Sequence, residues 1–217
     1  MGFISNVLGG QKASSENQFW KWFKKNITKF ENLKGHEDPI LDDLLSELQK
    51  YNKEFYFEMS SNKEDERELI ITVEGKTELF ETVENFVKSA PSISGWKIIA
   101  LKPPMGFDYK TNYEGIEFSP KTMWFLPLEN KEDPKALGLR IGIPDYKPEN
   151  ERVSMNAVLV ILDTSLGECS SSSDVNHVEI SDLPSNPDKE GYIMLQELPS
   201  YIAWRKKKLN TEQHAQQ

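Results

Sequence analysis

The sequence contains one cysteine, Cys169, so no disulfide can form within the chain and a disulfide-stapled secreted fold is excluded. No apolar run approaches the roughly 20 residues that a membrane-spanning helix needs. The first ten residues, MGFISNVLGG, lack the basic segment and the small-residue cleavage site of a secretory signal. We therefore expect a soluble protein of the reducing cytoplasm.

Motifs of common catalytic sites are also missing. There is no glycine-rich phosphate loop, no nucleophile elbow and no HExxH zinc motif. A cysteine nucleophile needs a histidine within hydrogen-bond reach, and only Cys169 and His177 lie near one another in sequence, across a run of serines. A structural role for both residues is the simpler interpretation. The sequence thus indicates no catalytic residue, no metal ligand and no cofactor, and it leans against an enzyme.

The composition is that of a soluble globular protein. Hydrophobic residues make up 37% of the 217 residues and charged residues make up 28%. This balance supports a packed core beneath a very polar surface. The length suffices for one large domain or two small ones.

Negative charge dominates the chain but is distributed unevenly. The net charge is −9, whereas residues 1–34 carry six lysines and two acids, a net +4. Residues 205–217 carry four basic residues and one acid, a net +3, so by difference residues 35–204 carry about −16. An acidic middle argues against nucleic acid as a specific partner.

Aromatic and lysine residues interleave in the stretch FWKWFKKN, residues 19–26. On a helical wheel the apolar residues of 19–33 fall within about 160° of arc, and the lysines fall on the other side. This separation favours a helix with its aromatic face in the core, because a single-strand reader places aromatics and cations together. The alternatives are a partner helix or membrane-surface docking through residues 1–33, with Phe3, Ile4, Val7 and Leu8 extending the apolar contact.

Hydrophobic periodicity predicts alternating strands and helices after two N-terminal helices, at about 16–33 and 39–51. Two β-β-α-β units follow, each with an NKED sequence in its hairpin loop. The first unit is expected at 54–60, 67–74, 77–89 and 96–101, and the second at 121–129, 136–143, 151–166 and 175–181. Residues 170–174 read as a linker, and 195–208 as a final helix.

The resulting fold class is α+β. We expect one mostly antiparallel sheet with helices packed on one face. The expected organisation is a flexible tail at 1–15, a single domain at 16–208 with halves at 54–104 and 114–184, and a disordered tail at 209–217.

The loop 102–115, KPPMGFDYKTNYEG, carries the most distinctive irregular sequence. Aromatic-bearing loops on a rigid sheet often bind a partner, although such a loop can equally fold back over the sheet edge. Arg140 is predicted on the sheet face opposite the helices, where it must reach water or pair with a carboxylate. The candidate binding residues are therefore Met105, Phe107, Tyr109, Tyr113 and Arg140.

Several segments resemble a family of bacterial cytosolic proteins of unassigned activity. The resemblance rests on the FWKWF helix at 19–23, ELIITVEG at 68–75, APSISGWKIIA at 90–100, GIEFSPKTMWF at 115–125 and ELPSYI at 197–202. It implies a bacterial, soluble α+β protein and carries over no catalytic residue.

The hypothesis that best fits these observations is a non-enzymatic protein-binding module, of inhibitor or immunity type, because an acidic protein suits a basic partner. One alternative is a small-molecule enzyme with a site near loop 102–115 and Cys169/His177. The other is peripheral membrane association through residues 1–33. The sequence does not indicate an oligomeric state.

Overall fold

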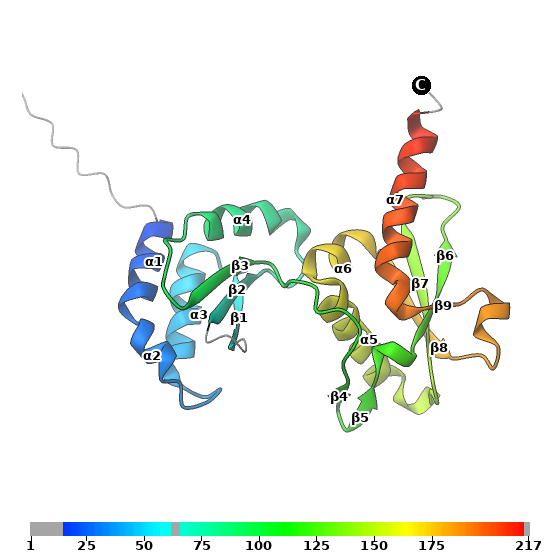
Figure 1. Ribbon diagram of the computed structural model, residues 1–217, viewed down its shortest axis with the longest axis horizontal. Helices are drawn as coiled ribbons and strands as arrows, with labels where there is room; N and C mark the ends of the chain where they lie inside the picture. Colours follow the sequence, from blue (N-terminus) through cyan, green and yellow to red (C-terminus); the bar gives the residue numbers. More distant parts are fainter. Residues whose placement is uncertain (1–14, 62–65, 215–217) are drawn as a thin grey trace, which may run out of the picture. The chain divides into compact units, whose positions relative to one another are not determined.

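The structure is a computed structural model that describes residues 15–61 and 66–214. Its contacts divide the chain into two compact units (Figure 1). Unit 1 falls within Met1–Val73 and Glu81–Ala100, and unit 2 within Glu74–Phe80 and Leu101–Gln217. Each unit has an α+β fold of its own, so the expected single domain at 16–208 comprises two compact units.

Unit 1 contains a three-stranded sheet of order β1-β2-β3 together with its helices. Strands β1 and β2 are antiparallel, whereas β2 and β3 are parallel. The elements are α1 (Ser15–Lys25), α2 (Ile27–Glu31), α3 (Pro39–Tyr51), β1 (Tyr56–Ser61), β2 (Arg67–Thr72), α4 (Phe80–Lys88) and β3 (Trp96–Ala100).

The aromatic face of the N-terminal helix forms the core of unit 1, as predicted. Trp20, Phe23 and Phe30 are buried, while Ile27 is half-buried. The Trp20 indole donates a hydrogen bond to Ser89 Oγ at 3.0 Å, and its ring lies 4.9 Å from that of Phe86. The lysine side chains of α1 are exposed. The membrane-docking residues Phe3, Ile4, Val7 and Leu8 lie outside the described residues.

The predicted helix at 16–33 is interrupted at Asn26. The Asn26 side chain donates to the Trp22 carbonyl at 2.9 Å, and this bond competes with continued helical pairing. The predicted helix at 39–51 is confirmed as α3. It begins after Asp38, whose carboxylate accepts a hydrogen bond from the Ile40 amide at 3.2 Å, and Pro39 occupies its first turn.

Unit 2 contains a four-stranded sheet of order β8-β7-β6-β9 and a separate two-stranded hairpin, β4-β5. Strand β7 pairs antiparallel with β6 and parallel with β8. The main elements are β4 (Thr111–Tyr113), β5 (Ile116–Phe118), β6 (Trp124–Glu129), β7 (Leu137–Ile143), α5 (Glu151–Leu166), α6 (Glu168–Asp174), β8 (His177–Asp182), β9 (Ile193–Met194) and α7 (Leu198–His214). Short 3-10 turns occupy Thr77–Leu79, Pro120–Thr122, Pro148–Asn150, Pro187–Glu190 and Leu195–Glu197.

Both β-β-α-β successions are present, at β1-β2-α4-β3 and at β6-β7-α5-β8. The expectation of one mostly antiparallel sheet is wrong, because each succession builds its own mixed sheet. A strand that returns after a helical crossover lies parallel to the strand it left. Hydrophobic periodicity locates strands but does not specify which strands pair, so the sequence pattern left this undecided.

The unit 2 core lies between the sheet and the helices α5 and α7. Leu139 and Ile141 on β7 are fully buried, as are Val158 and Ile161 on α5. Ile202 of α7 joins the same cluster. The prediction that β2 and β7 are interior strands is therefore confirmed, and the apolar face of β7 packs with helix α5 as predicted.

Two segments differ from the sequence expectation. Residues 170–174 belong to helix α6, in which the Ser170 hydroxyl donates to Asp174 and the Ser171 hydroxyl donates to the Glu168 carbonyl. These local bonds satisfy serine side chains that otherwise favour turns. Helix α7 continues to His214, beyond the expected end at 208. None of the described helices is long and apolar enough to cross a bilayer.

Candidate functional site

The loop 102–115 folds back onto the C-terminal end of α5. The Met105 amide donates to the Thr164 carbonyl at 3.0 Å, and the Gly106 amide donates to the Ser165 carbonyl at 3.3 Å. These carbonyls belong to the last turn of α5, where a helix has no internal donors left. The loop thus serves as a cap for this helix.

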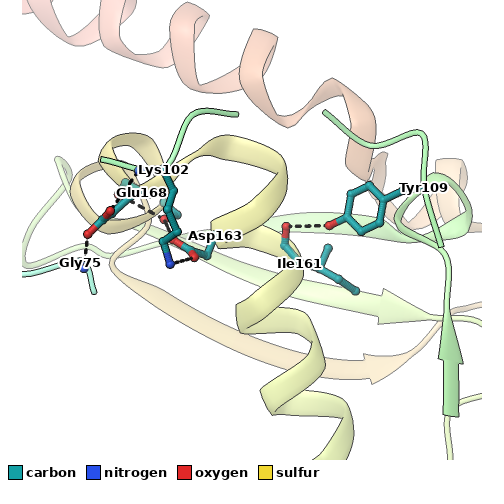
Figure 2. Close-up of polar contacts among 7 residues, drawn as sticks. Gly75, Lys102, Tyr109, Ile161, Asp163 and Glu168 are labelled. Atoms are coloured by element: carbon teal, nitrogen blue, oxygen red, sulfur yellow. Dashed lines mark hydrogen bonds and ion pairs between the residues drawn. The ribbon is translucent and has the colours of Figure 1, made fainter. Parts of the chain in front are cut away.

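Most of the aromatic side chains expected to bind a partner are used inside unit 2. Phe107 is 8% exposed and belongs to the core. Tyr109 shares a hydrogen bond with Ser165 Oγ at 3.0 Å and donates to the Ile161 carbonyl at 3.4 Å, as Figure 2 shows for Ile161. Tyr113 packs against the core, and Met105 alone among the four stays largely exposed, at 75%.

A buried carboxylate holds this region together. Glu168 has no exposed surface, and its two oxygens accept hydrogen bonds from the amides of Gly75 at 2.9 Å and Lys102 at 3.1 Å. The Glu168 amide in turn donates to the Lys102 carbonyl, and the Lys102 ammonium pairs with Asp163 (Figure 2). These contacts fasten residues 75 and 102, which flank the unit 1 segment 81–100 in the chain, to the start of α6.

Arg140 points to the sheet face opposite the core, as the strand alternation predicts. Its Nε and Nη2 donate to the same oxygen, Oε2 of Glu179, at 3.0 and 2.9 Å. The other oxygen of Glu179 lies 3.2 Å from His177 Nε2. The expected carboxylate partner of Arg140 is therefore Glu179, the residue directly across from it on β8.

The hydrogen bonds of this cluster shift the pKa values of Glu179 and Arg140. Hydrogen bonds from Arg140 and His177 lower the pKa of the Glu179 carboxyl. The hydrogen bond to Glu179 raises the pKa of the Arg140 guanidinium. Both side chains remain about 40% exposed, so the pair is a solvent-facing ion pair rather than a buried one.

A groove of about 610 Å³ lies beside this cluster. Residues of the β6–β7 hairpin and of the start of β8 line it. Its lining residues are Leu128, Glu129, Asn130, Lys131, Glu132, Ala136, Gly138, Asn176, His177 and Glu179. We call the surface formed by Leu128, Gly138, Arg140, His177 and Glu179 the open face.

The sheet face that carries Arg140 is covered by other residues near Gly142, toward the C-terminal end of β7. A Cβ atom on Gly142 would lie 2.8 Å from Leu183 Cδ1 and 3.2 Å from the Tyr192 ring. The segment that follows β8 therefore packs directly on Gly142, and Tyr192 is buried there. Only the half of the sheet around Gly138 and Arg140 is available to a partner.

The remaining candidate residues of the sequence analysis, Cys169 and His177, occupy different surroundings. Cys169 is an exposed residue of α6 and lines a depression of about 400 Å³ with Lys102, Pro104 and Ile202. His177 lines the groove of the open face. Among the residues that the structure describes, no three His, Cys, Asp or Glu side chains are grouped as metal ligands.

Comparison of the chain with protein-family models, curated proteins and solved structures finds no match.

Proposed function

We propose that the chain is a non-catalytic protein-binding module of the bacterial cytoplasm, and that the open face of unit 2 is its recognition surface. The observation that carries this proposal is the groove beside the Arg140–Glu179–His177 cluster, on the uncovered half of a sheet. A regular sheet holds these side chains in fixed positions, which reduces the entropy lost when a partner binds.

The charge of the groove supports a partner with basic residues. Three carboxylates line it, those of Glu129, Glu132 and Glu179, against the ammonium of Lys131 and the guanidinium of Arg140, which pairs with Glu179 beside the groove. The segment 35–204, which contains the groove and also much of unit 1, carries about −16 of charge by sequence. An acidic surface attracts a basic partner over a distance and raises the rate of association. An inhibitor or immunity protein directed at a basic protein would have this charge.

Site-specific photocrosslinking tests the proposal. A benzophenone amino acid is placed at His177 or Glu132 on the groove, or at the exposed Glu81 of unit 1 as the control. In cells of the source organism, we expect one and the same protein to be crosslinked from both groove positions and not from position 81. The purified partner should then bind the Glu132→Lys variant at least about tenfold more weakly, because a repulsive charge replaces an attractive one.

The control substitution for affinity is Glu81→Lys, which makes the same change of charge far from the groove in sequence. Equal crosslinking from all three positions, or unchanged affinity of Glu132→Lys, would remove the open face as the recognition surface.

A further inference from the structure

A second groove lies between helix α7 and the β6–β7 hairpin. It has a volume of about 290 Å³ and is lined by Pro127, Leu128, Glu129, Asn130, Lys131, Pro134, Leu137, Tyr201, Trp204, Arg205, Lys208 and Leu209. We call it the α7 groove. Its volume is at the lower end of the range for small-molecule pockets, so it suits a side chain of a peptide better than a whole cofactor.

Trp204 is the distinctive residue of this groove. Its side chain is 55% exposed, whereas Trp20 and Trp96 are buried in unit 1. The Trp204 ring lies 5.5 Å from the Tyr201 ring, and the Lys208 ammonium lies 5.5 Å from the Trp204 ring centre. An exposed tryptophan backed by a second ring is a typical anchor of protein interfaces.

Helix α7, which carries Trp204, is held in place by the neighbouring residue Arg205. The Arg205 guanidinium donates to the carbonyls of Pro134, Lys135 and Ala136 at 2.6 to 2.9 Å. Lys206 pairs with Asp174 at 2.6 Å on another side of the helix. These contacts hold α7 against the hairpin and against α6, so the groove exists before any partner binds.

Positive charge surrounds the exposed tryptophan. Three cations line the α7 groove, on Lys131, Arg205 and Lys208, against the single carboxylate of Glu129. In the described part of the chain, the ammonium groups of Lys131 and Lys208 have no acidic partner, and Lys207 beside them is exposed. Aromatic rings and cations therefore share one surface here, unlike on α1, where they occupy opposite faces.

We propose that the α7 groove binds an acidic peptide segment of a partner protein that carries an aromatic side chain. The aromatic residue enters the groove against Trp204 and Tyr201, and flanking carboxylates meet Lys131, Lys207 and Lys208. Cation–aromatic and ring–ring contacts favour an aromatic over an aliphatic side chain at this place. The α7 groove shares Leu128, Glu129, Asn130 and Lys131 of the hairpin with the groove of the open face, and it differs in charge because α7 adds Arg205 and Lys208. The proposal for the α7 groove does not depend on the function proposed for the open face.

Fluorescence anisotropy with synthetic peptides tests this site on the full chain. The probe is a labelled nine-residue peptide with a central phenylalanine among aspartates and glutamates. We expect binding that weakens with added salt, and at least about tenfold weaker binding when alanine replaces the phenylalanine. Trp204→Ala and Lys208→Glu should each weaken binding of the probe by about tenfold or more, while Trp204→Phe should retain most of it.

Lys24→Glu is the matched control, since it makes the same charge change on an exposed residue of α1 and should leave binding unchanged. Unchanged circular dichroism of each variant separates lost binding from lost folding. The proposal is overturned if the acidic peptide does not bind at millimolar concentration, or if the alanine peptide binds equally well. It is also overturned if a single-stranded oligonucleotide binds through Trp204 while the acidic peptide does not.

Discussion

The two β-β-α-β successions of this chain follow the same path but differ on the sheet face away from their helices. In both, an antiparallel hairpin is followed by a helix and a parallel strand. Leu69 and Ile71 on β2 correspond to Leu139 and Ile141 on β7, since each pair faces the helices and is fully buried.

The two successions differ at the strand residue that lies between the two buried residues of each pair. On β2, Ile70 lies opposite Ile99 of β3 and is 7% exposed, and its neighbour Thr72 is 3% exposed. On β7, the equivalent position is Arg140, which lies opposite Glu179 and is about 40% exposed. A shared topology therefore does not imply shared side chains, because the position is apolar on β2 and belongs to an exposed charged pair on β7.

The largest expected effect lies in the aromatic core of unit 1. Replacing Phe23 by alanine should lower the free energy of unfolding by about 3–5 kcal/mol, because a fully buried aromatic side chain leaves a cavity. Urea unfolding followed by circular dichroism measures this change. Phe125→Ala makes the matching change in the core of unit 2 and should cost a similar amount.

Lys24→Ala, on the exposed face of the same helix, should change stability by less than about 0.5 kcal/mol. A loss below about 1 kcal/mol for Phe23→Ala would mean that the aromatic face is not a core, and would support the partner or membrane interpretation of α1.

A smaller effect is expected at Glu168. Alanine at this position removes the acceptor for the half-buried Gly75 and Lys102 amides and should cost about 2–4 kcal/mol, at roughly 1–2 kcal/mol for each of the two unsatisfied groups. Glutamine keeps one acceptor oxygen and should cost about half as much. Amide hydrogen exchange should become faster at residues 75 and 102 in both variants, and unchanged exchange there would contradict the role assigned to Glu168.

The smallest effect concerns the ion pair on the open face. The pKa of the Glu179 carboxyl is lower in the folded chain than its ordinary value of 4.5, so the ionised form favours folding. This stabilisation is present above about pH 4.5 and is lost as the pH falls through the folded-state pKa. Because the pair faces solvent, its contribution should stay below about 1 kcal/mol.

Stability measured between pH 2 and pH 7 isolates this contribution. Glu179→Gln should remove this pH-dependent component, and Arg140→Gln should remove the larger part of it, because His177 still lowers the pKa of Glu179 in that variant. The double variant should remove no more than Glu179→Gln alone. If the losses of stability of the two single variants add up in the double variant, the ion pair between the two residues does not stabilise the fold.

Much of the fold follows from sequence patterns. The periodicity of 39–51 and of 151–166 places α3 and α5 with the observed bounds, because caps and apolar spacing agree there. The alternation along 136–143 places Leu139 in the core and Arg140 on the opposite face. Strand pairing was not predictable, since it depends on contacts between segments far apart in sequence.

The candidate site was harder to predict. Loop 102–115 carries the residue types of a binding loop, but its aromatics instead fill the core and cap α5. The structural role of Glu168 was not predictable, because one carboxylate among 35 acidic residues becomes distinctive only through its burial. Trp204 stands beside four consecutive basic residues, 205–208, and that juxtaposition was a sequence signal for the α7 groove.

The most direct test of the account is hydrogen–deuterium exchange of the full chain with and without the partner captured from the open face. We predict slower exchange in the complex at β8 and at the hairpin tip, residues 129–136, with no change in loop 102–115. Protection of loop 102–115 without any change at β8 or at 129–136 would contradict the account and restore the loop as the binding site.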